Sequence, residues 1–425
     1  MAELTGSTGT GSGTTAGEGA SVPIVSLRWM SLLALVQLGV IMASNASTQI
    51  LLPAHVERID AAHKEASLAV VFAVGSIVTA LANPLAGALS DRTRTRFGRR
   101  RPWVVAGALA GAVALAFLGT QHSIAGLVLG WSLAQLAFAL VLATAVAAVP
   151  DQVPVGQRGR ASALAGVAVL VGPLIGGAVV TFAVTGVSAG YLAMGVLLLV
   201  AALPFPLRYR EPELPPPGPR RPIRSAFKVS PRKHPDFAWA WLSRFLVNLA
   251  LSMGIGYLLY YLRDSLQYER LFPGATNEQG VLIIVTVFSL SSVLPGLAAG
   301  WWSDRSGRIR VVVFTGGVVM ALAALILALG DSWTTTLVAA GLLGAGTGVF
   351  VSVDQAMVTR LLPAEADRGK DLGLVSLAAS LGFVLGPVVA APLVTSSGGY
   401  PLMYGVAALS ALSGAALVWK IKGVR

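Results

Sequence analysis

Twelve long apolar runs, separated by short polar connections, constrain this chain more than any other feature. Most are close to the roughly 20 residues that a helix needs to cross the hydrocarbon core of a bilayer. A spanning segment satisfies its own backbone hydrogen bonds when it is helical. We predict an all-α membrane protein with twelve transmembrane helices. They lie near residues 28–53, 66–89, 103–121, 125–149, 160–185, 189–207, 237–262, 279–302, 311–329, 334–360, 371–395 and 401–420.

The composition agrees with a membrane protein and excludes several other classes. Charged residues make up 12 % of the chain, about half of the roughly 25 % that is usual for soluble proteins. The net charge of +12 comes from short basic clusters between the apolar runs, so we expect no nucleic-acid partner. There are no cysteines, and no nucleotide-binding, nucleophile or metal-ligand motif is present. We therefore expect no enzyme activity, cofactor or metal.

The basic residues also predict the orientation. Of the 31 Lys and Arg, 26 lie in connections on one side, one (Arg244) lies within a run, and four lie on the other side, namely Arg58, Lys64, Arg263 and Arg270. By the positive-inside rule, both termini should be cytoplasmic, in a plasma (inner) membrane. Residues 1–22 are rich in Gly, Ser and Thr, which predicts a disordered cytoplasmic tail.

The runs fall into two halves that repeat. Residues 208–235 are rich in proline and charge, so they predict a cytoplasmic linker between six-helix halves at 23–207 and 236–425. The charged loop GALSDRTRTRFGRRRPW at 87–103 has a shorter copy, GWWSDRSGRIR, at 300–310. GPLIGG at 172–177 and GPVVAA at 386–391 follow the two loops at nearly equal spacing. Such spacing indicates an internal duplication.

The first loop resembles the signature loop of the major facilitator superfamily of transporters. The resemblance implies that family's twelve-helix fold and a role in gating for Gly87, Asp91, Arg92, Arg96, Gly98, Arg99 and Arg100, for their second-half counterparts Gly300, Asp304, Arg305 and Arg308, and for Gly172 and Pro173 of the fifth helix. From the residues themselves, Gly87 should allow another helix to approach closely. Asp91 should accept hydrogen bonds from a helix N-terminus or an arginine. Arg99, Arg100 and Arg101 form a basic cluster that can bind lipid headgroups.

Two charges within the spans suggest a transport path. Arg244 and Asp354 lie at about the same depth, roughly 12 Å inside one boundary at 1.5 Å per residue, and an isolated charge there is costly. We predict that they pair and line a central cavity. In the alternative, Arg244 extends to the headgroups and Asp354 caps a broken helix. Asn248, Ser252 and Tyr260 continue the face of Arg244 along the same helix.

Amide side chains are the other candidates for the substrate path. Asn45, Gln49, Gln135 and Gln355 lie within predicted spans, and amides near aromatic rings suit a polyhydroxylated ligand. A purely structural role in joining helices is the competing interpretation. The four histidines fall in loops or at span ends, and we expect a solvated His55.

Short stretches resemble the branch that holds sucrose transporters and glycoside-pentoside-hexuronide symporters. They include YLLYYLRD at 257–264 and DQAMVTRLLPAEADRGKDLGLVSLA at 354–378. This resemblance implies uptake of a sugar or glycoside with a proton or a sodium ion. In melibiose-type members of the branch, aspartates within the second helix bind the coupling cation, and here the second span has none before Asp91, which favours a proton over sodium. Uniport without a coupled ion is a further alternative. The glycines around 172 resemble drug–proton antiporters, so proton-driven efflux of an amphipathic compound is the alternative. A ligand sensor without transport is a third hypothesis. We expect membrane lipid as a partner and a monomer.

Overall fold

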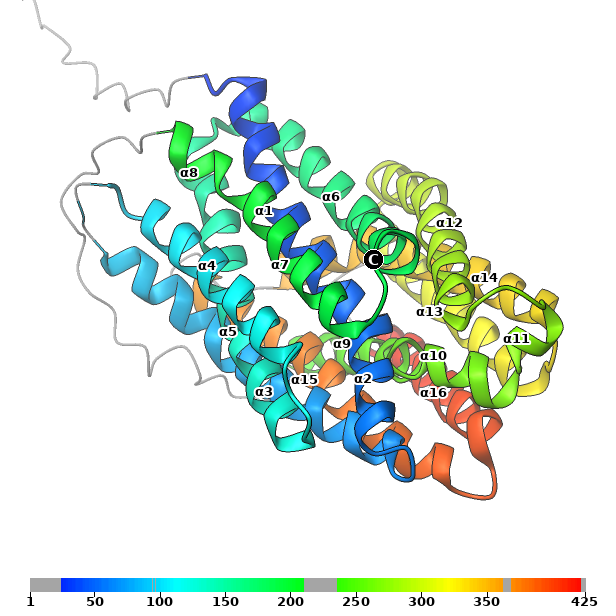
Figure 1. Ribbon diagram of the computed structural model, residues 1–425. Helices are drawn as coiled ribbons and strands as arrows, with labels where there is room; N and C mark the ends of the chain where they lie inside the picture. Colours follow the sequence, from blue (N-terminus) through cyan, green and yellow to red (C-terminus); the bar gives the residue numbers. More distant parts are fainter. Residues whose placement is uncertain (1–23, 94, 96, 210–234, 362–367, 422–425) are drawn as a thin grey trace, which may run out of the picture.

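The computed structural model describes residues 24–93, 95, 97–209, 235–361 and 368–421 (Figure 1). The predicted tail at 1–22 and nearly all of the predicted linker at 208–235 lie outside this part of the chain. Their boundaries therefore stay predictions.

Twelve helices of the described residues are long and apolar enough to cross a membrane, which confirms the predicted fold class. The first six spans comprise α1 (Leu27–Ala46) with η1 (Ser47–Leu51) and α2 (Leu52–Ile59), α3 (Lys64–Arg92), α4 (Arg101–Leu118), α5 (Ile124–Gln152), α6 (Arg158–Ala178) with η3 (Val179–Ala183), and α7 (Val187–Ala202) with α8 (Pro204–Arg208). The last six comprise α9 (Pro235–Gly256) with α10 (Leu258–Tyr260) and η5 (Tyr261–Ser265), α12 (Asn277–Ser306), α13 (Ile309–Leu329), α14 (Trp333–Leu361), α15 (Arg368–Thr395), and α16 (Gly399–Leu417) with η6 (Val418–Lys420). The short α11 (Tyr268–Leu271) lies before α12.

Local sequence explains where several helices start. Ser26 caps α1 and Ser123 caps α5, each by accepting a hydrogen bond from a backbone N–H of the first turn. Thr276 and Gln279 form a capping box at the start of α12. The seventh span is interrupted at Tyr257, so α9 ends at Gly256 and continues through α10 into the π-helical turn η5.

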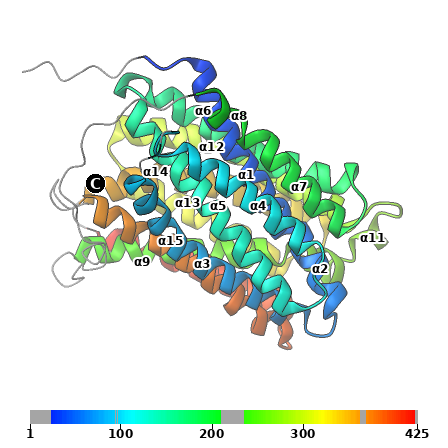
Figure 2. The same ribbon diagram turned by 60° about the vertical axis from the view of Figure 1, so that its left-hand side comes forward.

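The two halves pack by the same scheme. In the first half α1 packs on α6 and α7, α5 packs on α3 and α4, and α4 packs on α7. In the second half α9 packs on α15 and α16, α14 packs on α12 and α13, and α13 packs on α16. Between the halves, α3 packs on α15 and α6 on α12, and Figure 2 shows α3 and α15 side by side. The duplication seen in the sequence is therefore also a duplication of helix packing.

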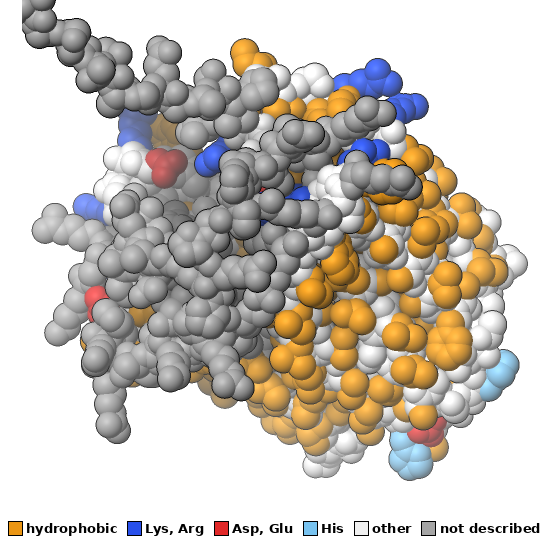
Figure 3. Space-filling view, turned by 90° about the vertical axis from the view of Figure 1, so that its left-hand side faces the viewer, with side chains coloured by type: hydrophobic (Ala, Val, Ile, Leu, Met, Phe, Trp, Pro, Cys, Tyr) orange, Lys and Arg blue, Asp and Glu red, His pale blue; other side chains and the backbone are white. Residues whose placement is uncertain are grey.

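The outer surface of the spans is apolar. Leu81, Val113, Phe182 and Leu294 are each at least 60 % exposed, which is costly in water and favourable in lipid. The face in Figure 3 shows a broad apolar area, with Lys and Arg side chains toward its upper edge. The chain is a multi-pass membrane protein.

The two ends of the molecule carry different connections. The arginine end is the end at which α3 leads into α4 and α12 into α13, with residues 93–100 and 307–308 between them. The opposite end holds the connection from α2 to α3 and the turn η5. In Figure 2, α2 and α11 lie at the opposite end.

Candidate functional site: a charged cavity and a cross-half cluster

Arg244 and Asp354 form an ion pair between α9 and α14. Arg244 Nη1 lies 3.2 Å from Asp354 Oδ2, and the two side chains are 17 % and 6 % exposed. The predicted pairing is confirmed, and the alternative in which Arg244 extends to the headgroups is wrong. Each partner balances the charge of the other, which offsets the high cost of a lone charge at this depth.

The pair lines a cavity of about 130 Å³ in the second half. Asn248, Thr347 and Phe350 line the same cavity, with apolar walls from Val247, Leu251, Met320 and Val351. Arg244 Nε and Asp354 Oδ1 are buried and have no hydrogen-bond partner among the described residues. Buried polar atoms in native proteins are normally hydrogen-bonded, so the cavity offers a donor and an acceptor to a guest molecule or to water.

Of the other predicted substrate residues whose side chains the structure describes, only Asn248 lines this cavity. Its Nδ2 donates to the Arg244 carbonyl at 2.8 Å. Asn45 Nδ2 donates to the Ile41 carbonyl at 2.9 Å, and Gln49 Nε2 donates to Asn45 Oδ1 at 3.3 Å. These two amides therefore bond within the first span, whereas the structural interpretation expected amides to join one helix to another.

Gln135, Gln355 and Tyr260 were the remaining substrate candidates. Gln135 is half-buried on α5 and does not line the cavity. The side chain of Gln355 lies outside the described part of the chain. Tyr260 does not line the cavity: its hydroxyl donates to the Pro53 carbonyl at 2.8 Å, at the opposite end. The break at Tyr257 changes the phase of a helix that the sequence pattern indicated to be continuous.

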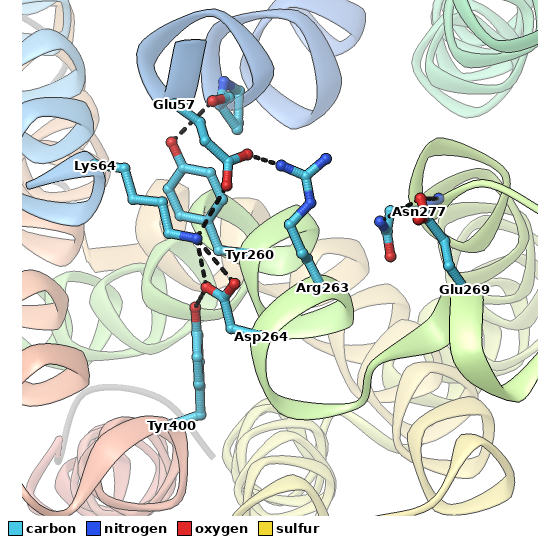
Figure 4. Close-up of polar contacts among 9 residues, drawn as sticks. Glu57, Lys64, Tyr260, Arg263, Asp264, Glu269, Asn277 and Tyr400 are labelled. Atoms are coloured by element: carbon cyan, nitrogen blue, oxygen red, sulfur yellow. Dashed lines mark hydrogen bonds and ion pairs between the residues drawn. The ribbon is translucent and has the colours of Figure 1, made fainter. Parts of the chain in front are cut away.

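Four charged side chains meet at the opposite end, where they join the halves (Figure 4). We call Glu57, Lys64, Arg263 and Asp264 the cross-half cluster. Lys64 Nζ lies 3.2 Å from Glu57 Oε1 and 2.7 Å from Asp264 Oδ2. Arg263 pairs with Glu57. Two positive and two negative groups therefore alternate, with Glu57 and Lys64 from the first half and Arg263 and Asp264 from the second.

Tyrosines surround the cross-half cluster. The Tyr400 hydroxyl donates to Asp264 at 3.4 Å, and the Lys64 ammonium lies 4.8 Å from the Tyr260 ring centroid. The Tyr257 hydroxyl lies 3.1 Å from the Glu65 carbonyl of the first half and 3.0 Å from the Pro387 carbonyl of the second. Sequence reasoning counted Lys64 and Arg263 only as loop charges. The signal that could have identified them was the adjacent Arg263–Asp264 pair directly after the YLLYYL stretch.

Asp60 lies near the cross-half cluster but binds only first-half residues among those described. Ser67 Oγ donates to its Oδ2 at 2.8 Å, and His63 Nδ1 lies 3.2 Å from its Oδ1. These contacts, the Ser67 hydrogen bond first, hold the pKa of Asp60 below its usual range. Asp60 is thus a carboxylate of the same end that does not bridge the halves.

At the arginine end, the structure corrects the prediction of a lipid-binding arginine cluster. Arg100 is 4 % exposed, and its Nε donates to Asp151 Oδ2 at 3.0 Å while Nη1 donates to the Thr144 carbonyl at 3.3 Å. Arg99 Nη2 lies 3.5 Å from Asp151, and Arg101 Nε donates to the Pro206 carbonyl at 2.6 Å. The arginines fasten α4 to α5 and α8. Sequence reasoning missed Asp151, which follows Pro150 near the end of α5, just after the predicted fourth span.

Gly87 is not the close-approach site that we predicted. A Cβ on Gly87 would meet no atom within 4 Å, so the space beside this residue is open. Gly98 has a different local reason: its φ of 100° lies in the left-handed region, as does the 67° of Gly307 in the second loop. The side chains of Asp91, Arg92 and Arg96 lie outside the described part of the chain.

The second-half loop residues are mainly exposed. Asp304, Arg305 and Arg308 lie on the surface, and the Arg305 guanidinium lies 5.4 Å from the Trp301 ring centroid. Gly300 approaches only Ser352, at 4.0 Å from the position of an added Cβ. The gating role of these residues stays a prediction.

Two glycines of α6 pack closely on α1. A Cβ on Gly172 would lie 2.8 Å from Ile41 Cγ2, and one on Gly176 would lie 2.7 Å from the Met42 carbonyl oxygen. Pro173 lies inside α6. In the second half, a Cβ on Gly386 would overlap Ser252 on α9. The equivalent helix pairs α1–α6 and α9–α15 therefore both depend on glycine.

His55 is not solvated as expected. It is 7 % exposed, its Nε2 lies 2.9 Å from the Gln121 carbonyl, and its ring is 5.8 Å from that of Tyr191. The first span continues through η1 and α2 to Ile59, which places His55 inside the helix. Among the described residues, no group of three or more His, Asp or Glu could hold a metal ion.

Comparison with known proteins identifies similar chains. A profile described as the Major Facilitator Superfamily matches residues 33–276 and 271–424. The MFS transporter asaE of Aspergillus flavus is 26 % identical over 232 residues, 53 % of this chain and 48 % of that protein. Multidrug resistance protein 2 of Bacillus subtilis is 29 % identical over 104 residues, 24 % of this chain and 26 % of that protein. The chain spans less than half the length of these curated relatives.

A solved structure shows the same fold. A crystal structure of a mutant of the nucleoside transporter NupG superposes with a TM-score of 0.72 and covers 92 % of this chain and 99 % of that one. The sequence identity is 15 %. At this identity the likeness concerns the fold alone.

Proposed function

Since the chain belongs to the Major Facilitator Superfamily and is therefore a secondary transporter of a small molecule, we propose that it takes up a sugar or glycoside together with a proton. The signature loop and the short stretches at 257–264 and 354–378 support this branch of the family. Transport would proceed by the halves rocking about a site near the middle of the membrane.

The Arg244–Asp354 pair is the observation on which this proposal depends. A sugar hydroxyl can accept a hydrogen bond from Arg244 Nε and donate one to Asp354 Oδ1, two of the buried cavity atoms without a hydrogen-bond partner among the described residues. Phe350 adds an aromatic wall and Asn248 an amide. The same carboxylate can bind a proton. Protonation of Asp354 would remove the charge that holds Arg244, and so it would link proton binding to the cavity's shape.

The charge distribution supports an orientation for this transport. We propose that the arginine end faces the cytoplasm, because most Lys and Arg lie in the connections at that end. The opposite end, with the cross-half cluster, then faces outward. The two signature loops, with Asp91, Arg92 and Arg96 in the first and Asp304, Arg305 and Arg308 in the second, would act as the inner gate.

Efflux of an amphipathic compound is the second candidate. Its support is the similarity to Multidrug resistance protein 2, together with the close packing of Gly172 and Gly176 of α6 on α1. In that case the same carboxylate would bind protons that enter as the compound leaves.

Uptake by proteoliposomes tests the proposal. A panel of labelled sugars is offered with and without an inward proton gradient, to the wild type and to Asp354→Asn. We expect one sugar to accumulate only with the gradient, and Asp354→Asn to abolish accumulation while sugar exchange at equal concentrations persists. Absence of sugar flux with gradient-sensitive movement of a cationic dye would instead establish efflux. Undiminished accumulation by Asp354→Asn would remove this residue from proton coupling.

A further inference from the structure

The cross-half cluster joins two segments that have no covalent connection near this end of the molecule. Glu57 lies in α2 and Lys64 begins α3, whereas Arg263 and Asp264 lie in η5. Lys64 and Asp264 are 200 positions apart in the chain. Figure 4 shows the four side chains converging between these elements. Any opening of the halves at this end must therefore separate Lys64 from Asp264 and Glu57 from Arg263.

The cluster is partly withdrawn from water. Lys64 and Glu57 are 11 % and 17 % exposed, and Arg263 and Asp264 are 37 % and 33 % exposed. Partial burial strengthens each attraction relative to a surface ion pair. Because each charge has a neighbour of opposite sign, removing one member leaves a poorly solvated charge behind. The closed arrangement thus depends on all four groups.

Hydrogen bonds from neighbouring tyrosines to backbone carbonyls also hold the two halves together at this end. Tyr260 bonds the Pro53 carbonyl, and the Tyr257 hydroxyl lies between the Glu65 and Pro387 carbonyls. At the arginine end, the space beside Gly87 on α3 is open. The end that these contacts close and the open space beside Gly87 therefore lie at opposite ends of the molecule.

We propose that the cross-half cluster is a latch that keeps the opposite end closed and sets the resting equilibrium between the two forms of the transporter. Weakening it shifts the population toward the form that is open at the opposite end. The region of the latch contains two π-helical turns: η1 precedes α2, which carries Glu57, and η5 carries Arg263 and Asp264. Such turns replace the regular hydrogen bonds of a helix and often mark functional positions.

The latch can be tested by measuring the distance between the halves. The chain has no cysteine, so Ala62→Cys and Ser397→Cys, at exposed positions in the connections before α3 and α16, allow site-specific spin labels. Pulsed electron–electron double resonance on the full chain in nanodiscs then measures the distribution of distances between the two labels, and so the fraction of molecules in which this end is open. We expect Lys64→Gln and Glu57→Gln each to raise the long-distance population on the order of threefold, as for the loss of a modest ion pair.

Matched variants separate the latch from general damage. Asp60→Asn removes a carboxylate of the same end that makes no described contact across the halves, and it should leave the distances unchanged. Lys64→Arg keeps the charge and should also retain the wild-type distribution. Lys64→Gln combined with Asp264→Asn should open the end less than the sum of the two single changes, because the groups interact directly.

The outcome is decided by these distances alone. Unchanged distributions in Lys64→Gln and Glu57→Gln, or an opening by Asp60→Asn as large as theirs, would overturn the latch. The latch rests on the proposed transport cycle for its purpose, but the measurement requires no sugar and no proton gradient. Its failure is therefore distinguishable from failure of the sugar uptake experiment.

Discussion

At the scale of single residues, two arginines largely buried in this protein pair with carboxylates on other helices. Arg244 pairs with Asp354 and Arg100 with Asp151, each joining two spans. In a low-dielectric interior an unpaired charge costs several kcal/mol, whereas a pair is close to neutral in its effect on stability. Removing one member of a pair should therefore be more damaging than removing both.

Arg244→Ala should destabilise the protein more than Arg244→Ala combined with Asp354→Ala. The single change leaves Asp354 buried without its counter-charge, at a cost of about 3 kcal/mol. Thermal unfolding of the purified variants in one detergent measures the order. A double variant no more stable than the single one would contradict the pairing.

Arg100→Lys should also lower stability, by about 1 to 2 kcal/mol, although the charge is retained. Arg100 uses Nε toward Asp151 and Nη1 toward the Thr144 carbonyl, and an ammonium cannot reproduce this fork. Yield of folded protein and its unfolding temperature are the measurements. Arg308→Lys, at an exposed position in the second loop, is the control that should behave like the wild type.

At the scale of helices, close packing depends on glycines at selected positions. In α6, Gly172 and Gly176 face α1, whereas a Cβ on Gly166 would meet nothing within 4 Å. The same helix therefore contains both a tight and an open glycine. This contrast distinguishes the effect of packing from the effect of helix propensity.

Gly176→Ala should destabilise the first half by about 1 to 3 kcal/mol, because its Cβ would press on the Met42 backbone, which cannot move aside freely. Gly166→Ala has open space and should be neutral or stabilising by up to about 1 kcal/mol. Unfolding temperatures of the two variants, compared in the same detergent, measure the difference. Equal behaviour of the two variants would show that packing of α6 on α1 is not tight.

At the scale of the whole molecule, transport requires the halves to exchange contacts at the two ends. In our proposals, the cross-half cluster holds the opposite end closed and the signature loops form the gate at the arginine end. Asp91→Asn should reduce the initial rate of transport at least tenfold with little loss of folded protein. The change keeps the size of the side chain and removes the charge that the gating role requires. Flux in proteoliposomes, normalised to reconstituted protein, is the measurement, and unchanged flux would remove Asp91 from the gate.

Much of the fold could be predicted from local sequence. Apolar length determines which segments span a bilayer, so the twelve helices followed directly. Depth within a span is also a local property, since each residue adds about 1.5 Å. For this reason the Arg244–Asp354 pair could be predicted from residue positions alone. The repeated loops indicated the duplication that the helix packing also displays.

The cross-half cluster, the burial of Arg100 and the open space beside Gly87 were decided only by the tertiary structure. Lys64 and Asp264 are separated by 200 positions, and Arg100 and Asp151 by 51. Which of many similar loop charges meet depends on how helices rotate and how the halves close. Uniformly apolar spans have little periodicity to determine that rotation. The sequence by itself determined the spans and their depth, and packing between spans decided which charges pair.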